Sequence, residues 1–200
     1  MTSLEERQAA RRRQMLDAGI EMLGAPEPGV LGVRAVCRST GITERYFYEA
    51  FGTREGFVHA VYRDVSERAQ RVIGDALARA GAAGEPLHRA AVDAYFDFVV
   101  EQPSIGRALL LGPDREPALA ARGPQEATAF IEMMVAARSD EIDENLARMA
   151  AVALVGAQAV TYIAYLSGGI DVPRAAVVDY CVHLIEASTD YLAHRARSGS

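Results

Sequence analysis

Aromatic and charged side chains alternate along residues 44–51, ERYFYEAF, at a spacing that gives a helix two different faces. Phe47 and Phe51 are four residues apart, so we expect them on one side of the helix, packed into a core. Arg45 and Tyr46 then lie near the helix start, where a recognition helix reaches the edges of bases. The segment therefore predicts a helix that packs one face and presents the other to a nucleic-acid groove.

The residues before this helix predict a second, shorter helix and a tight turn. Val33, Val36 and Cys37 recur at three- and four-residue spacing, which places one apolar stripe on a helix ending near residue 40. Gly41 is a natural end for it, because glycine readily adopts the left-handed conformation found at helix ends. Thr43 is a preferred N-cap for the following helix. Two short helices joined by a three-residue turn indicate a helix-turn-helix.

The sequence GITERYFYEAFGTREGF within this stretch resembles the signature of the tetracycline-repressor (TetR) family of bacterial transcriptional regulators. In that signature a glycine, a helix cap, a tyrosine, a phenylalanine and a basic residue follow one another at these intervals. Here the matching positions are Gly41, Thr43, Tyr48, Phe51 and Arg54. The likeness covers roughly residues 15–61 in sequence.

The resemblance implies an all-α protein with two domains. Residues 1–53 would form a three-helix helix-turn-helix DNA-binding domain, and residues 54–200 a helical ligand-binding and dimerisation domain. Carried over position by position, the family pattern also implies a DNA-binding face. In it Arg34 reads bases from the first short helix, Thr43, Glu44, Arg45 and Tyr46 form the recognition face, and Tyr48 and Arg54 contact backbone phosphates.

Three positions depart from the family pattern. Gly32 replaces the usual Ser or Thr before the first short helix, and Arg54 replaces the commoner lysine; both changes are mild, since glycine is a tolerated cap and arginine binds phosphate well. Glu44 adds a negative charge at the recognition face. This carboxylate can accept a hydrogen bond from a cytosine amino group or can repel a phosphate, and the sequence leaves both interpretations open.

The formal net charge of −6 is unusual for a DNA-binding protein until it is divided along the chain. Residues 1–63 contain nine arginines and eight acidic residues, whereas the remainder contains twelve arginines and nineteen acidic residues. Lysine is absent. DNA affinity must therefore come from individually placed arginines and helix N-termini, and we expect binding to be sensitive to salt.

The distribution of cysteine and histidine argues against metal sites, disulfides and catalysis. Cys37 and Cys181 lie far apart, and no CxxC or His-Cys cluster occurs. We expect no metal and no cofactor. Cys181 is interpreted as a small buried apolar residue, and the sequence leaves a redox role for it open. The N-terminus reads as a charged helix rather than a signal peptide, which predicts a cytoplasmic protein. Motifs of hydrolases, phosphate-binding loops and zinc proteases are also absent, so we do not expect an enzyme.

Residues 149–170, MAAVALVGAQAVTYIAYLSGGI, contain no charged residue and are long enough to span a bilayer. The segment is rich in Ala and Gly and contains several polar side chains, so membrane insertion would gain little. We instead interpret it as a helix between its own domain and a partner, since small residues allow close approach. A second helix over 173–194 has an apolar stripe at three- to four-residue spacing. Helices near 149–168 and 173–194 thus predict a homodimer, without a membrane.

Helices account for the rest of the chain. We expect them at about 3–23, 54–80, 86–102, 103–111 and 124–137, with a loop over 112–117, GPDREP. The family resemblance implies a pocket for a small-molecule effector in the C-terminal part. Its candidate lining residues are aromatic, methionine and amide side chains: Tyr95, Phe98, Phe130, Met133, Met134, Gln158 and Tyr162.

These observations predict a homodimeric transcriptional regulator, a repressor that an effector releases from a palindromic operator. Two alternatives stay open: a helical DNA-binding scaffold without an effector and, less favoured, an all-helical enzyme. The operator sequence, the regulated genes and the effector cannot be named from the sequence.

Overall fold

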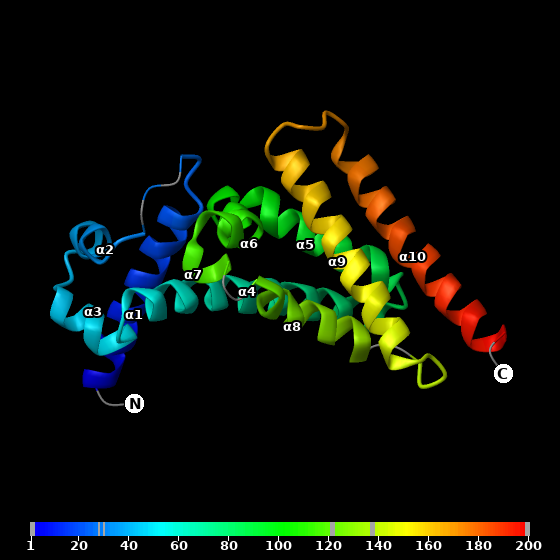
Figure 1. Cartoon of the computed structure of the whole chain (residues 1–200), viewed down its shortest axis with the longest axis horizontal. Helices are drawn as coiled ribbons and strands as arrows, with labels where there is room; N and C mark the ends of the chain where they lie inside the picture. Colours follow the sequence, from blue (N-terminus) through cyan, green and yellow to red (C-terminus); the bar gives the residue numbers. More distant parts are fainter. Residues whose placement is uncertain (1–2, 28, 30, 121–122, 137–138, 199–200) are drawn as a thin grey trace. The chain divides into compact units, whose positions relative to one another are not determined.

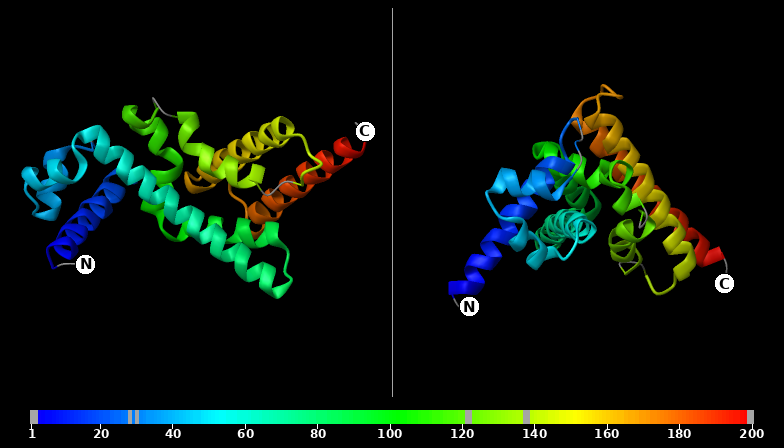
Figure 2. Two further views of the ribbon diagram at one scale, coloured as in Figure 1. Left: turned by 90° about the horizontal axis from the view of Figure 1, so that it is seen from below. Right: turned by 60° about the vertical axis from the view of Figure 1, so that its left-hand side comes forward.

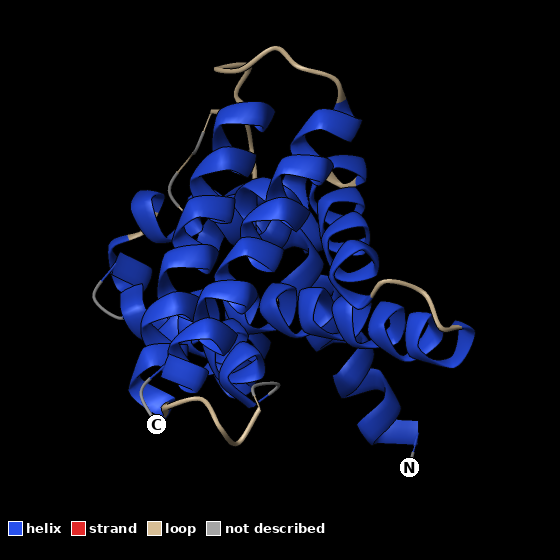
Figure 3. Ribbon diagram, turned by 90° about the vertical axis from the view of Figure 1, so that its right-hand side faces the viewer, coloured by secondary structure: helices blue, strands red, loops and turns tan. Residues whose placement is uncertain are grey.

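The computed structural model describes residues 3–27, 29, 31–120, 123–136 and 139–198. This part of the chain forms helices joined by loops and contains no strand (Figure 3), which confirms the predicted all-α class. Figure 1 labels the helices in chain order. Their bounds are α1 Ser3–Leu23, α2 Val33–Thr40, α3 Glu44–Phe51, α4 Arg54–Ala83, α5 Leu87–Glu101, α6 Pro103–Arg115, α7 Pro117–Ala120, α8 Gly123–Ala136, α9 Glu144–Leu166 and α10 Arg174–Ser198.

The chain divides into two compact units. Unit 1 comprises Met1–Ala69 and Glu101–Gly123, and unit 2 comprises Gln70–Val100 and Pro124–Ser200. Unit 1 thus contains α1 to α3, the first part of α4, and α6 with α7. It is larger than the predicted DNA-binding domain of residues 1–53, because α6 packs with α1, and α7 with α6, in the same unit. The division of function at residue 53 remains a prediction.

In unit 1, α1 and α4 approach each other closely at a glycine. A Cβ added to Gly19 would lie 2.5 Å from a Val61 methyl group and 2.7 Å from the Phe57 ring. Phe57, Val61 and Val65 are completely buried. Charged groups flank this apolar contact, since the Arg13 guanidinium donates to both oxygens of Asp64 at 2.7 and 2.8 Å. The crossing is therefore fixed both by apolar burial and by a bidentate ion pair between the two helices.

Helix α6 extends beyond its predicted end. We expected a loop over 112–117, but α6 continues through Gly112 and Pro113 to Arg115, so that expectation was wrong. A proline in a helix removes the N–H that would bind the carbonyl four residues earlier, here that of Leu109. The buried Tyr62 hydroxyl donates to this Leu109 carbonyl at 3.1 Å. Tyr62 thereby satisfies the acceptor that Pro113 leaves open, and the helix can continue.

The C-terminal end of α1 packs against the start of α6 through backbone atoms. A Cβ on Gly24 would lie 1.8 Å from the Ser104 carbonyl oxygen, so only glycine fits there. Two arginines of α6 donate to the adjacent carbonyls, Arg107 to that of Gly24 at 2.5 Å and Arg115 to that of Ala25 at 2.9 Å. At this point α1 and α6 are therefore in direct backbone contact.

In unit 2, α9 and α10 run side by side in opposite directions (Figures 1 and 2). Val178 and Val182 of α10 are buried within the unit. The predicted seam of α10 therefore packs inside its own protomer at this end and is not available to a partner. At this end of α10 the predicted interhelical seam thus lies within one protomer, and a dimer through α9 and α10 remains a prediction.

Helix α9 has an uncovered apolar face. Met149, Val152 and Val160 are exposed, with the small residues Ala153 and Gly156 exposed between them. These positions follow a three- to four-residue spacing and form one stripe. Helix α9 is also long and apolar enough to cross a membrane, a property that core helices of soluble proteins share. In the single chain α9 is therefore not covered on all sides, and its part in a subunit contact remains a prediction.

Candidate nucleic-acid interface and effector site

The predicted helix-turn-helix is present in unit 1 with the expected bounds. Helix α2 ends at Thr40, and Gly41 follows it with a φ of 70°, the left-handed conformation for which glycine was assigned. Helix α3 begins after Thr43, which occupies the N-cap position but makes no side-chain cap hydrogen bond. Ile42 is buried between the two helices. The turn thus depends on backbone conformation and on one apolar side chain, and the Thr43 side chain is exposed.

Helix α3 is anchored by aromatic contacts on one side. Phe47 is completely buried, and its ring centroid lies 5.4 Å from that of Phe51 and 5.0 Å from that of Phe57. Tyr48 remains half exposed and meets Phe47 edge-on at 5.5 Å. Its ring is therefore in contact with the core while about half of the residue stays accessible, as a phosphate contact would require.

Two predicted DNA-binding arginines are exposed and paired with acidic residues of α3. The Arg34 side chain is 89 % exposed, and its Nε lies 3.8 Å from a Glu44 carboxylate oxygen. The Arg45 side chain is 85 % exposed and donates to Glu49 at 2.9 Å, one helical turn away. Without DNA, the carboxylate of Glu44 thus lies near an arginine and partly neutralises it. Such exposed pairs are weak, so a ligand can separate them.

Arg54 lies in a more buried ion pair. Its guanidinium donates to both carboxylate oxygens of Glu116 at 2.7 and 3.2 Å, and the Glu116 side chain is only 6 % exposed. Glu116 also accepts from the backbone N–H of Ala118 at 3.4 Å, at the junction of α6 and α7. Arg54 therefore connects the start of α4 to this junction, and in this state its donors are engaged within the protein.

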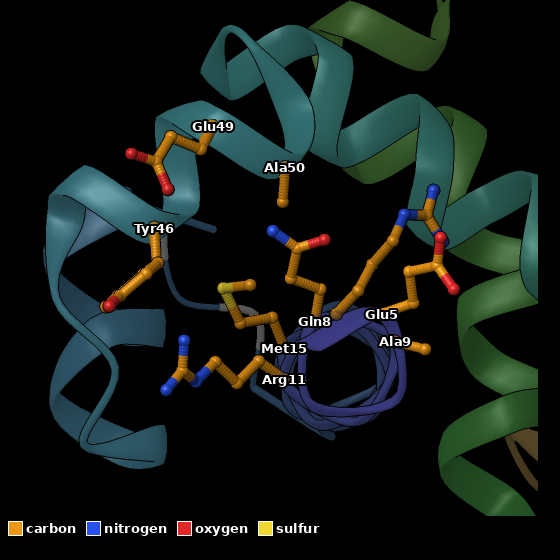
Figure 4. A pocket seen from close by; sticks show the side chains of 9 residues that line it. Glu5, Gln8, Ala9, Arg11, Met15, Tyr46, Glu49 and Ala50 are labelled. Atoms are coloured by element: carbon orange, nitrogen blue, oxygen red, sulfur yellow. The ribbon is translucent and has the colours of Figure 1, made fainter. Parts of the chain in front are cut away.

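A cleft of about 380 Å³ separates the N-terminal half of α1 from α3. Figure 4 shows the Arg11 side chain extending from α1 toward Tyr46, and the Arg11 guanidinium lies 4.3 Å from the centre of the Tyr46 ring. Arg12 lies similarly over Phe51, at 5.2 Å. These are cation–π distances, so both arginines are held against the helix predicted to read bases. Sequence reasoning missed them, although the run RQAARRRQ was a signal of concentrated positive charge.

The predicted effector residues lie in unit 2, and the structure brings some of them together. The Tyr95 ring contacts Phe130 and Tyr162, with centroids 5.9 and 5.6 Å apart. The buried Tyr162 hydroxyl donates to the Gln158 side-chain oxygen at 3.3 Å. Of the other predicted effector residues, Phe98 is buried, and Met133 and Met134 are half-buried.

Three residues of this cluster were not predicted. The Phe96 ring packs against Tyr162 at 5.3 Å and Tyr165 at 5.2 Å, and the Arg174 guanidinium lies 5.6 Å from its centre. In the sequence, Phe96 of α5 and Tyr165 of α9 could not be distinguished from the other apolar residues around them. Arg174 begins α10, far from both in sequence. At these distances the rings are in direct contact. A ligand that entered the cluster would therefore have to separate rings that now pack together.

Two ionisable groups inside unit 2 are kept in their neutral forms. Burial, reinforced by Cys181, raises the pKa of Tyr162 far above its usual value. Burial also raises the pKa of the Cys181 thiol, although the neighbouring Tyr162 hydroxyl opposes this shift. The thiol is completely buried. Cys181 is therefore a protonated, enclosed group at neutral pH, in keeping with its interpretation as a small apolar residue.

No family model matches the sequence, and no curated protein matches it. Solved structures do share its fold. A TetR-like transcriptional regulator from Rhodococcus sp. RHA1 is 20% identical, with a TM-score of 0.60, over 96% of this chain and 98% of that one. The multidrug binding protein EbrR, complexed with imidazole, is 20% identical, with a TM-score of 0.62, over 87% of this chain and 94% of its own.

A further transcriptional regulator from Rhodococcus sp. Rha1 is 13% identical, with a TM-score of 0.58, over 92% of this chain and 96% of its own. The likeness thus extends over nearly the whole chain in each case. The protein has the fold of TetR-like transcriptional regulators, and the fold implied by the sequence motif is confirmed.

Proposed function

We propose that this chain is a DNA-binding transcriptional regulator of the TetR family, acting as a homodimeric repressor in the cytoplasm. The observation that carries the proposal is the geometry of α2, Gly41 and α3. A buried Phe47 anchors α3, while Arg45, Tyr46 and Tyr48 remain at its exposed surface. A short helix anchored on one side and polar on the other fits the major groove, where its first residues meet base edges.

The proposed division of roles follows the exposure of each residue. Arg34, Thr43, Glu44, Arg45 and Tyr46 would face base edges, and the Tyr48 hydroxyl a backbone phosphate. Arg54 can serve as a phosphate contact only if it leaves Glu116, so its role depends on the state of the α6–α7 junction. For Glu44, the pairing with Arg34 at 3.8 Å supports a third role. It orients Arg34 in the free protein, in addition to any contact with cytosine.

The uncovered stripe of α9 supports the homodimer. Met149, Val152 and Val160 are more than half exposed. A Cβ on Gly156 would have no atom of the described residues within 4 Å, apart from its own stretch of helix. An apolar stripe with small residues at its centre permits close packing of a second copy against itself about a two-fold axis. Two heads related by that axis would reach successive major grooves, which requires a palindromic operator.

The aromatic cluster of unit 2 supports an effector site, with the Tyr162 hydroxyl and Gln158 as its polar groups. Pockets for small molecules are mostly apolar, with a few such groups placed to fix orientation. EbrR, which has the same fold, is described as a multidrug binding protein and was solved with imidazole. We infer that an apolar effector enters between Tyr95, Phe130 and Tyr162 and releases the repressor from its operator.

The test begins with selection of bound fragments from genomic DNA by the purified protein, followed by fluorescence anisotropy on the recovered sequence. Arg34→Ala and Tyr48→Phe should each weaken operator binding, by roughly 10-fold for a lost contact of about 1.4 kcal/mol. Sedimentation equilibrium should still give a dimer for both. Selection of random fragments, or parental affinity in both variants, would overturn the proposed function or its DNA-binding face.

Dimerisation is tested separately with Val160→Glu, which places a charge on the α9 stripe. We expect this variant to sediment as a monomer and to lose operator affinity. Val172→Glu is the matched control, because Val172 is also exposed but lies in the loop between α9 and α10. A monomeric parent protein, or a dimeric Val160→Glu variant, would contradict the proposed interface.

A further inference from the structure

The arginines of unit 1 differ in whether a carboxylate neutralises them. Arg34, Arg45 and Arg54, the three predicted from sequence, are each paired with a glutamate. Arg13 and Arg68 are paired with aspartates. In α6 of the same unit, Arg107 and Arg115 donate to backbone carbonyls rather than to carboxylates. Among the described residues of α1, α2, α3 and the first part of α4, four further arginines have no carboxylate within ion-pair distance. These are Arg11, Arg12, Arg38 and Arg63.

Among these four, Arg11 and Arg12 have a defined position beside α3. Arg11 lies over the Tyr46 ring at 4.3 Å, and Arg12 over the Phe51 ring at 5.2 Å. Both line the cleft between α1 and α3, and Figure 4 labels Arg11 there. A guanidinium that rests on a ring keeps N–H donors at its edge, in the fork geometry that fits phosphate oxygens. Both guanidinium groups are therefore positioned before any ligand arrives.

We propose that Arg11 and Arg12 of α1 form a phosphate-binding site that grips the DNA backbone beside the segment read by α3. This inference rests on the proposed function and adds α1 to the DNA-binding face. Because phosphate contacts are independent of base sequence, the site fixes the position of α3 and strengthens binding to every duplex. It also supplies positive charge that the paired arginines of α2 and α3 cannot offer without first losing a glutamate.

Two carboxylates line the same cleft and must be considered. Glu49 accepts a hydrogen bond from Arg45 at 2.9 Å, which compensates its charge. Glu5 lies on the α1 side of the cleft and has interactions of its own. A phosphate that approached Arg11 and Arg12 would still be repelled by Glu5. Removing that charge by Glu5→Gln should therefore strengthen DNA binding, the opposite of the effect expected for the arginine variants.

The test measures affinity against salt concentration for Arg11→Gln, Arg12→Gln and the double variant. The probes are the recovered operator duplex and an unrelated duplex of equal length. Loss of one phosphate contact should make the negative slope of log K against log[salt] shallower by about 0.9. The affinity lost by the variant should therefore be roughly 8-fold greater at 0.1 M salt than at 1 M salt. The change should be equal for both duplexes. Arg63→Gln is the matched control, an exposed arginine of α4 outside the cleft.

A purely structural role of Arg11 is separated from a phosphate contact by Arg11→Lys, which keeps the charge. Under the proposal this variant retains the parental salt slope, and helix content and melting temperature are unchanged in all variants. An unaltered slope in the double variant would overturn the inference, as would a slope lost equally in Arg63→Gln. A loss that Arg11→Lys fails to restore, accompanied by a lower melting temperature, would also overturn it. If the parent protein binds no duplex at all, the proposed function fails; if it binds its operator and only the slopes disagree, the inference alone fails.

Discussion

Each unit of this protein contains one aromatic cluster, and the two clusters differ in chemistry. In unit 1, Phe47, Phe51 and Phe57 pack with centroids 4.8 to 5.4 Å apart, and none of the three carries a polar side-chain atom. In unit 2, the cluster combines two phenylalanines with three tyrosines, and the hydroxyl of Tyr162 is paired with Gln158. Its rings are those of Tyr95, Phe96, Phe130, Tyr162 and Tyr165.

This difference separates a cluster suited to holding a helix from one suited to accepting a ligand. Phenylalanine rings are stabilised by burial alone, so the unit 1 cluster is most stable when its rings pack against each other and no ligand separates them. A buried tyrosine needs a hydrogen-bond partner, and a ligand with suitable polar atoms can replace that partner without loss. The head would therefore keep one shape, while the unit 2 cluster could exchange internal contacts for contacts with an effector.

The largest expected effect comes from Phe47→Ala. Phe47 is fully buried, so its truncation should lower the free energy of unfolding by about 3–5 kcal/mol. Phe130→Ala is the comparison in unit 2, where the half-buried ring should contribute less. Urea denaturation followed by circular dichroism measures both variants. Equal losses of unfolding free energy would mean that the two clusters stabilise the fold equally, and would contradict the distinction between them.

An intermediate effect is expected for Tyr162→Phe, which removes one hydroxyl from the unit 2 cluster. The Gln158 oxygen loses its donor, so stability should fall by about 1 kcal/mol. Tyr165→Phe is the control, because Tyr165 is half-buried and its hydroxyl makes no hydrogen bond to the described residues. If an effector uses this hydroxyl, thermal stabilisation by a saturating effector should shrink in Tyr162→Phe only. A larger loss in Tyr165→Phe would contradict the assigned polar group.

The smallest effect concerns the charges that flank the α1–α4 contact. Burial alone would raise the pKa of Asp64, but hydrogen bonding to Arg13 and the charge of Arg68 outweigh it and lower that pKa below its usual value. A lowered pKa in the folded state means that the stabilisation is present above the unfolded value of about 3.9 and is lost as the pH falls through the folded value.

Acid denaturation of Asp64→Asn should accordingly show a weaker dependence on pH below about 4 than the parent, with a stability difference of about 1 kcal/mol or less at neutral pH. Asp97→Asn in unit 2 is the control, because Asp97 pairs with Arg174 at the surface. Parallel pH profiles of Asp64→Asn and the parent would exclude Asp64 as the source of the acid sensitivity.

Local features of the fold could be predicted from sequence because their causes lie within a few residues. The bounds of α2 and α3 followed from apolar spacing and from Gly41, whose left-handed conformation is observed. The continuation of α6 through Pro113 could not be predicted, since the compensating hydroxyl of Tyr62 is distant in sequence. Single-sequence patterns report periodicity and turn chemistry, and such remote hydrogen bonds leave no trace in them.

The same limit applies to the candidate DNA-binding face. Its position on α3 followed from residue types, but the pairing of its arginines did not. Arg54 was assigned to phosphate by family likeness, whereas in the structure it is bound to Glu116, 62 residues away. Conversely, Arg11 and Arg12 belong to a helix that the motif does not include, and only the folded structure places them over Tyr46 and Phe51.

The contact between Gly24 and Ser104 has a mechanical consequence. Side chains are the compliant parts of a helix contact, because they can change rotamer and absorb a displacement. At Gly24 the backbones of α1 and α6 meet directly, and Arg107 and Arg115 fasten the same two carbonyls. A backbone contact of this kind leaves the two helices little freedom to move relative to each other. A displacement of the start of α6 would therefore move α1 as a whole, including its middle, where Arg11 and Arg12 lie.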